Sequence, residues 1–240
     1  MRIGVVCEGP TDFFAIKEFL GHSLETEGVE TQFVPLQPEI DKTASDGGWT
    51  QVLTWLLRNP PATRIQKYFG GGLFGGTLGV EPMNGLLIQL DSDILGDDGF
   101  KKFVRDVLDL DVENPAASAA RAEQVKTVLS RASKLAEMTD ADVERHVLAP
   151  AVESTENWCV AAFLTPTRDF ETLAGAELVD EFMCALERSE GKDPSPPYSK
   201  ISKGKRRRRR FCSTHRNCSQ RVITGCFQFS AAHDQLLALS

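Results

Sequence analysis

Short apolar runs alternate with amphipathic stretches through the N-terminal part of the chain. Arg2–Cys7 is apolar, partly β-branched and followed closely by a Gly-Pro pair, so it predicts a buried strand. Apolar residues at helical spacing over Thr11–Leu24 predict a helix after it. Val29–Leu36 then predicts a second strand, Trp49–Arg58 a second helix and Gly85–Leu90 a third strand. This order predicts an α/β fold with a mostly parallel sheet flanked by helices on both faces.

The same alternation continues toward residue 190. Six glycines among the ten residues of Gly70–Gly79 predict a loop before the third strand. The later elements are one strand and four helices, predicted over His146–Val152 for the strand and over Phe100–Leu110, Ala116–Met138, Ser154–Phe163 and Gly175–Arg188 for the helices.

A break rich in Pro and Ser at Ser189–Pro197 predicts a domain over residues 1–190 and an extension over residues 191–240. The net charge is −7, but residues 200–240 hold ten basic residues and one acidic residue, a charge of +9, which leaves −16 for residues 1–199. A basic extension beside an acidic domain indicates either contact with a polyanion or docking on the domain itself. Because apolar residues return over Phe227–Leu239, we expect the extension to pack back on the domain.

The composition excludes several classes of protein. With 41% hydrophobic and 25% charged residues, the chain is neither disordered nor fibrous. Its longest apolar runs are far shorter than the roughly 20 residues that a membrane-spanning helix needs, and its N-terminus does not fit a signal peptide. We therefore expect a cytoplasmic protein that does not contact membranes. The glycine-rich segment fits neither a dinucleotide-binding motif nor a P-loop.

Carboxylic acids follow three of the predicted strands. Glu8 comes after the first strand, Asp91 and Asp93 after the strand that ends at Leu90, and Glu153 and Glu156 after the strand at His146–Val152. Parallel strands bring their carboxyl ends to one edge of the sheet, where ligands of such sheets bind. Taken singly, these acids could be turn or helix-cap residues. Together they predict a site for Mg²⁺ or Mn²⁺, because clustered oxygen ligands without histidine suit these cations better than Zn²⁺.

Two of these motifs carry a resemblance to a known family. The turn from Glu8 to Asp12 after a first strand, followed by the apolar approach to Asp91-Ser92-Asp93, resembles the Toprim domain of topoisomerases, primases and OLD-type nucleases. The chain is most similar to the small Toprim-like proteins of the RloB type, which are associated with bacterial phage defence. In those proteins a Glu-x-Trp at a helix start and a later Tyr-x-Lys are matched here by Glu156-Asn157-Trp158 and Tyr198-Ser199-Lys200.

The similarity covers most of residues 1–200, and it implies a Toprim-like (Rossmann-like) fold. It also implies that Asp91 and Asp93 hold Mg²⁺ and that Glu8 acts as general acid/base or shares in metal binding. Glu156, and with it Glu153, would complete a second coordination position; if both lie in one helix, their spacing of three residues puts them on the same face. An ABC-type ATPase partner protein is implied by the resemblance alone. The arginine run at residues 206–210 and the glycine-rich loop do not belong to the pattern.

The basic extension could bind the phosphate backbone of nucleic acid. The candidate residues for this contact are Lys200, Lys203, Lys205, Arg206, Arg207, Arg208, Arg209 and Arg210. A solvated charge run is the alternative. Cys212, His215, Cys218 and Cys226 could hold a structural Zn²⁺, although their spacing matches no strong zinc pattern.

These observations predict a Mg²⁺-dependent nuclease of Toprim type that cleaves phosphodiester bonds of DNA or RNA, including tRNA, in antiphage defence. A metal-activated water would supply the nucleophile. Two alternatives remain open. One is a non-catalytic metal- or nucleotide-binding subunit that docks on the ATPase, and the other is a phosphohydrolase that acts on small phosphate compounds.

Overall fold

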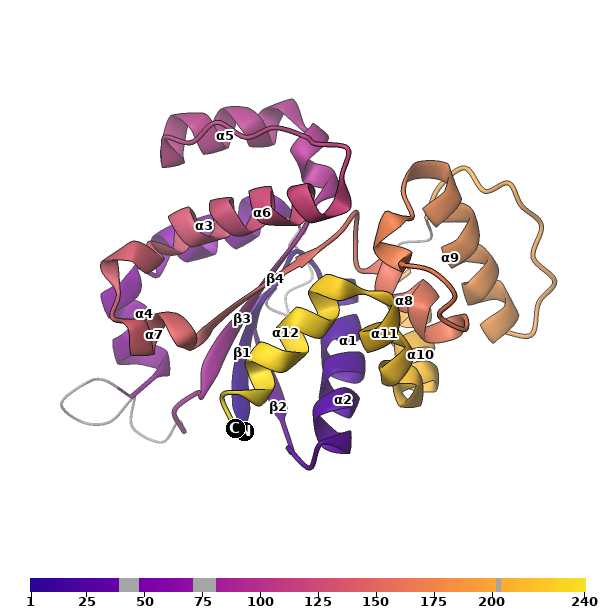
Figure 1. The fold of residues 1–240 in the computed structure, drawn as a ribbon, viewed down its shortest axis with the longest axis horizontal. Coiled ribbons are helices and arrows are strands. Elements are labelled where there is room, and N and C mark those ends of the chain that lie inside the picture. The colour runs from indigo at the N-terminus through magenta and orange to yellow at the C-terminus, as the bar shows by residue number, and fades with distance from the viewer. Residues whose placement is uncertain (39–47, 71–80, 202–203) are drawn as a thin grey trace.

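The computed structural model describes residues 1–38, 48–70, 81–201 and 204–240. Four strands form one all-parallel sheet in the order β2-β1-β3-β4 (Figure 1). Their bounds are Arg2–Val6 for β1, Gln32–Gln37 for β2, Gly85–Asp91 for β3 and His146–Ala151 for β4. This confirms the predicted α/β class with a parallel sheet flanked by helices, which is consistent with a Rossmann-like fold.

Helices connect the strands and cover the sheet. Those before residue 140 are α1 (Pro10–Ala15), α2 (Gly21–Thr26), α3 (Trp49–Arg58), α4 (Pro61–Tyr68), α5 (Asp98–Leu108) and α6 (Ser118–Ser133). A π-helical turn, Ile16–Leu20, joins α1 to α2. Those that follow are α7 (Asp140–Glu144), α8 (Glu156–Phe163), α9 (Gly175–Ser189), α10 (Lys205–His215), α11 (Ser219–Gly225) and α12 (Phe227–Leu237). Short 3₁₀ turns lie at Asp93–Gly96, Leu135–Glu137, Phe170–Thr172 and Arg216–Cys218. None of the helices described has the length and apolar character to cross a bilayer.

The two faces of the sheet bury two separate hydrophobic clusters. Successive strand residues point to opposite faces, and β1 shows this directly: Val5 packs into the cluster that holds α1 and α12, whereas Val6 packs into the cluster that holds α3, α5 and α6. β3 lies inside the sheet and is apolar at nearly every position, as a strand covered on both faces requires. β2 lies at the edge of the sheet and carries Pro35, which an edge strand tolerates because it need not donate to a neighbour on its outer side.

Several element bounds differ from the predicted ones. The helix predicted over Ala116–Met138 ends at Ser133, because Lys134 adopts a left-handed conformation with φ of 53°. The sequence analysis missed α4, which begins at Pro61, where a proline fits the first turn because its missing N–H would be unpaired there anyway. Most of the loop predicted at Gly70–Gly79 lies outside the described residues.

The described part of the C-terminal segment packs on the sheet and on α1. α12 lies against β4, and α10 lies against α1 (Figure 1). Phe211, Val222, Phe229 and Leu236 are buried in the same cluster as Val5 of β1. The helices after residue 204 are therefore part of the core on this face of the sheet.

Candidate acidic site at the carboxyl edge of the sheet

The carboxyl ends of β1, β3 and β4 lie side by side and bring the five predicted acids to one edge. Glu8 follows β1, Asp91 ends β3 and Asp93 follows it. The backbone N–H of Asp91 donates to Glu8 Oε1 over 2.7 Å, so the first acid is fixed to the end of the neighbouring strand. The backbone N–H of Asp93 donates to the carbonyl of Glu153 over 3.1 Å, which joins the ends of β3 and β4. Glu156 begins α8, directly beyond.

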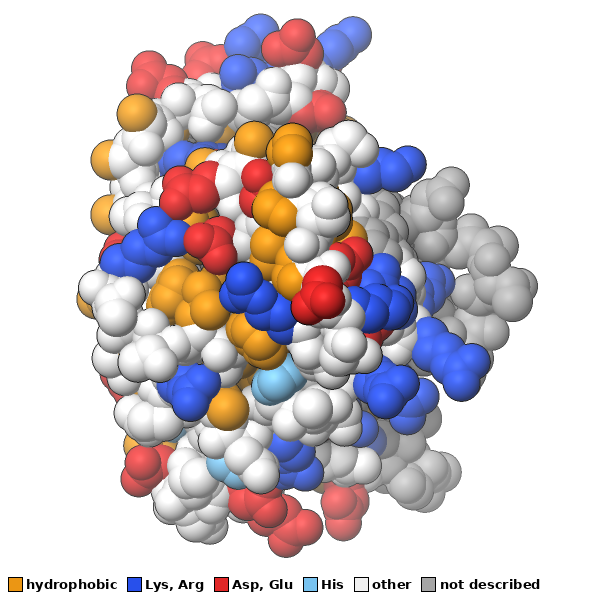
Figure 2. Space-filling view, turned by 90° about the vertical axis from the view of Figure 1, so that its right-hand side faces the viewer, with side chains coloured by type: hydrophobic (Ala, Val, Ile, Leu, Met, Phe, Trp, Pro, Cys, Tyr) orange, Lys and Arg blue, Asp and Glu red, His pale blue; other side chains and the backbone are white. Residues whose placement is uncertain are grey.

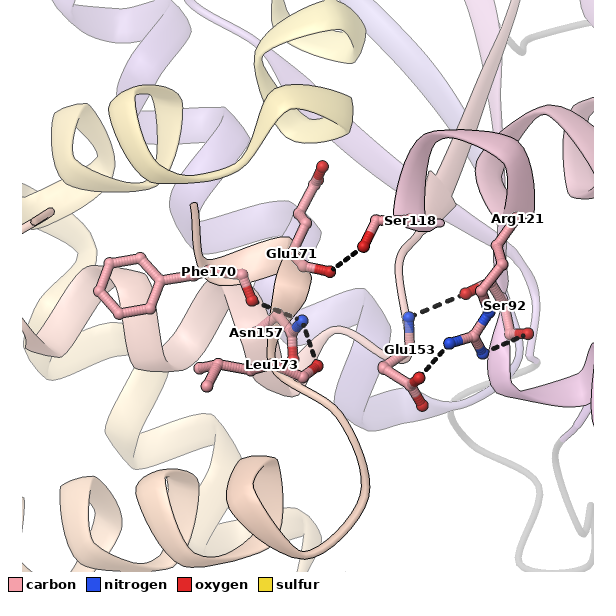
Figure 3. Close-up of polar contacts among 8 residues, drawn as sticks. All are labelled: Ser92, Ser118, Arg121, Glu153, Asn157, Phe170, Glu171 and Leu173. Carbon is pink, nitrogen blue, oxygen red and sulfur yellow. Dashed lines mark hydrogen bonds and ion pairs between the residues drawn. The ribbon is translucent and has the colours of Figure 1, made fainter. Parts of the chain in front are cut away.

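Ser92 forms hydrogen bonds that join the ends of β3 and β4. It is fully buried; its N–H donates to the carbonyl of Ala151 over 2.9 Å, and its hydroxyl accepts the N–H of Glu153 over 2.8 Å. Arg121 of α6 donates to the carbonyl of Ser92 over 2.9 Å and forms an ion pair with the Glu153 carboxylate (Figure 3). These contacts support Glu153 in a left-handed conformation, with φ of 52°, that a residue with a side chain rarely adopts.

The geometry of Glu153 and Glu156 differs from the predicted one. α8 begins at Glu156, so Glu153 lies before the helix and the two carboxylates do not share a helical face. Each instead meets an arginine: Arg121 pairs with Glu153, and Arg208 of α10 pairs with Glu156. Among the described residues, no ion pair joins Glu8, Asp91 or Asp93 to a basic side chain.

A sixth acid, Asp12, belongs to this edge, although the sequence analysis treated it only as part of the turn after the first strand. It lies in the first turn of α1 and is 6% exposed. Its Oδ1 accepts the hydroxyl of Thr155 over 2.6 Å, and Thr155 is itself buried in front of α8. Thr155 is far from Asp12 in the sequence, so no local pattern marks the pair.

The acids raise one another's pKa values. Burial raises the pKa of Glu8 to about 8, and the negative charge of Asp12 adds to the effect. Burial, followed by the charge of Glu8, raises the pKa of Asp91 well above its ordinary value. Burial also raises the pKa of Asp12 to about 6 with help from the charge of Glu156, and that of Asp93 to about 6 with help from Glu153. The edge is therefore a set of carboxyl groups that a bound cation would help to ionise.

The basic residues predicted to contact nucleic acid fall into three groups. Those of α10 and its approach that are exposed are Lys200, Lys205, Arg206, Arg209 and Arg210, whereas Lys203 lies outside the described residues. Arg207 forms an ion pair with Glu190 over 2.7 Å. Arg208 is 2% exposed, so its guanidinium is not on a surface that a phosphate can reach, and we leave it out of the candidate nucleic-acid interface. Figure 2 shows Lys and Arg side chains at several separate places on one face of the molecule, with acidic side chains among them.

Two of the four residues considered as zinc ligands make other polar contacts, and Cys226 is buried in the core cluster that Cys218 packs against. Cys212 is buried with its Sγ 3.9 Å from that of Cys159, and His215 Nε2 lies 2.8 Å from the Ser189 hydroxyl. All six cysteines are free thiols. Within the part of the chain that the structure describes, no three or more His, Cys, Asp or Glu side chains are grouped closely enough to form a ready metal site.

Comparison of the chain with protein-family models, with curated proteins and with solved structures finds no match. The chemistry of the acidic edge is therefore the basis for a functional hypothesis.

Proposed function

We propose that this protein is a Toprim-like, Mg²⁺- or Mn²⁺-dependent nuclease. The observation that supports the proposal most is the packing of Glu8, Asp91 and Asp93 at the carboxyl edge of a parallel sheet, with pKa values raised by burial and by one another. Repulsion among these carboxylates lowers the stability of the folded protein. Acids with raised pKa values at a ligand-binding edge of a sheet are typical of functional sites.

The donor atoms at the acidic edge are of the type that a hard divalent cation binds, although among the described residues they are not grouped as a ready metal site. Glu8, Asp91 and Asp93 present carboxylate oxygens and have no ion-pair partner among the described residues, and Mg²⁺ and Mn²⁺ prefer oxygen ligands. Both Glu8 and Asp91 are partly exposed, so solvent and a ligand can reach them. A bound cation would supply charge neutralisation of the phosphodiester and a more acidic water.

Glu8 suits the movement of a proton. One carboxylate oxygen accepts the N–H of Asp91, which fixes the side chain and leaves the other oxygen for proton exchange. With its pKa raised to about 8, Glu8 is largely protonated at neutral pH while no cation is bound, so it can donate a proton there as a general acid.

Nucleic acid is the substrate that best fits the neighbouring surface. The side chain of Arg208 in α10 reaches Glu156 at the acidic edge, and the exposed arginines Arg206, Arg209 and Arg210 lie on the same helix. Arginine forks match phosphate geometry. The resemblance to RloB-type proteins supports a role in phage defence beside an ABC-type ATPase.

The test is direct incubation of the purified protein with plasmid DNA, single-stranded DNA and total tRNA, with and without Mg²⁺ or Mn²⁺. We expect cleavage of at least one substrate in the presence of the cation, and a loss of about 100-fold or more in Glu8→Gln and in Asp93→Asn. Glu27→Gln is the matched control and should keep full activity, because Glu27 is exposed and lies between α2 and the amino end of β2, at the opposite end of the sheet.

Thermal unfolding of each variant shows whether lost cleavage is a loss of chemistry or of fold. Cation binding without cleavage of any of the three substrates would refute the nuclease activity and favour the non-catalytic subunit. Equal cleavage by Glu8→Gln would remove Glu8 from the chemistry.

A further inference from the structure

Arg208 points from the middle of the arginine run into the protein. α10 buries one face, formed by Arg208, Phe211 and Cys212 at helical spacing, and leaves Arg206, Arg209 and Arg210 exposed. The Arg208 guanidinium forms an ion pair with Glu156, donates to Cys159 Sγ over 2.7 Å and lies 4.5 Å from the centre of the Phe182 ring.

A buried guanidinium needs negative charge around it. Removing a charge from water costs several kcal/mol unless opposite charges compensate it. Glu156 is the ion-pair partner of Arg208. Burial and the charge of Glu156 raise the pKa of Asp12, and the positive charge of Arg208 partly offsets this increase. Contacts place Glu156 at the acidic edge: Thr155, directly before it, donates to Asp12 over 2.6 Å, and the carbonyl of Glu153 accepts the N–H of Asp93 over 3.1 Å. Arg208 is therefore coupled through Glu156 to the carboxylates that we propose as cation ligands.

The contacts of Arg208 also distinguish it from a general structural arginine. Its Nε is buried and has no hydrogen-bond partner among the described residues, so the guanidinium is not fully satisfied by hydrogen bonds. Arg64 of α4, by comparison, is buried against β4 and donates to His146, to the carbonyl of Asn59 and to that of Ser133, and no carboxylate of the described residues contacts it. Arg64 is held by neutral acceptors, whereas Arg208 is held by charge.

We propose that Arg208 is a built-in counter-cation of the acidic edge, which positions Glu156 and opposes divalent-cation binding there by repulsion. This inference rests on the proposed cation site. It gives the arginine run a second role besides nucleic-acid contact, because the same helix sets how strongly the acidic edge attracts its cation. A purely structural ion pair would affect folding stability and leave cation affinity unchanged.

The experiment is a double-mutant cycle on the full chain, with Mn²⁺ affinity measured by calorimetry and folding measured by urea denaturation. The variants are Arg208→Met, Glu156→Gln, both together, and Arg208→Lys, with Arg209→Met as the control from the exposed side of α10. Arg208→Met removes one positive charge near the site and should tighten Mn²⁺ binding on the order of tenfold. Arg208→Lys keeps the charge and should stay within about threefold of the wild type.

Glu156→Gln should weaken Mn²⁺ binding, and the double variant should bind more tightly than Glu156→Gln alone. The double variant leaves no unpaired charge at this position, so it tests the repulsion even if Arg208→Met unfolds.

The outcomes separate this inference from the proposed function. If the wild-type protein binds Mn²⁺ and removing Arg208 leaves the affinity unchanged in both backgrounds, Arg208 is only structural and the inference is overturned, while the proposed cation site stands. If the wild type binds neither Mn²⁺ nor Mg²⁺, the proposed cation site is refuted, and the proposed effect of Arg208 on cation binding is refuted as well.

Discussion

The acidic edge predicts that folding stability decreases as the pH rises toward neutrality. The pKa of Glu8 increases from 4.5, its ordinary value, to about 8 in the folded protein. Between these two values the folded chain keeps a proton that the unfolded chain has lost. Stability is therefore highest at mildly acidic pH and is lost as the pH rises, until Glu8 is ionised in both states.

The size of the effect follows from proton linkage. One additional proton bound by the folded state lowers the free energy of unfolding by about 1.4 kcal/mol per pH unit, or ~3 kcal/mol between pH 5.5 and 7.5. Because Glu8 is partly exposed, solvent screens part of this difference, and we expect a loss of about 1–3 kcal/mol. Glu8→Gln preserves an acceptor for the N–H of Asp91 and removes the titrating group, so it should be the more stable protein at pH 7.5.

The assay is urea denaturation of the wild type, Glu8→Gln and the control Glu27→Gln at three pH values from 5.5 to 7.5, in the absence of divalent cations. The difference in slope between the wild type and Glu8→Gln measures the titration of Glu8 together with its effect on the neighbouring acids. Saturating Mg²⁺ should restore stability to the wild type at pH 7.5, by about 2.7 kcal/mol at a concentration 100 times the dissociation constant. Identical pH slopes for the wild type and Glu8→Gln would refute the reasoning.

Three further predictions concern other parts of the molecule. Asp91→Asn combined with Asp93→Asn should abolish Mg²⁺ and Mn²⁺ binding in calorimetry while the protein stays folded; undiminished binding would exclude these ligands. Glu171 is buried, burial raises its pKa to about 7, and it accepts the N–H of Gln228 at the start of α12. Glu171→Ala should therefore lower the free energy of unfolding by about 1–2 kcal/mol in urea denaturation. Glu171→Gln should keep this hydrogen bond and remove the decrease of stability that the wild type shows between pH 4.5 and 7. Replacing the three exposed arginines of α10 by Gln should lower the salt slope of nucleic-acid binding by about 0.7–0.9 per lost phosphate contact, and replacing Lys101, Lys102 and Arg131 elsewhere on the surface should leave it unchanged.

The sheet was predictable because its strands are locally distinct. A central parallel strand is buried on both faces, so Gly85–Asp91 is apolar almost throughout, and Arg2–Val6 is nearly so. α3 has the bounds that the sequence predicts, because a glycine precedes it and prolines follow it. α4 was missed since it has few apolar residues and buries Arg64, whose partners, among them His146 and the carbonyl of Ser133, come from distant elements.

The acidic site was predictable only where an acid follows a strand. Glu8, Asp91 and Asp93 follow from strand order, because parallel strands end at one edge. The place of Asp12 in the site could not be predicted, because its burial depends on Thr155 and on α8, which begins after Thr155. The pairing of Glu153 with Arg121 likewise depends on how α6 packs beside β4, which the local sequence does not determine.

The arginine run illustrates why a charge count alone misleads. Two interpretations, phosphate contact and docking on the acidic body, were alternatives for the run as a whole. The helical period instead divides the five residues: Arg208 faces the core, Arg207 pairs with Glu190, and the other three are exposed. Docking on the acidic body therefore describes Arg207 and Arg208, whereas the three exposed arginines stay candidates for phosphate contact. Replacing all five at once would remove a buried ion pair, at a cost of about 3–5 kcal/mol, together with the exposed charges. A loss of nucleic-acid binding in that variant could not be distinguished from a loss of fold, so a variant that spares Arg207 and Arg208 is the one that tests the interface.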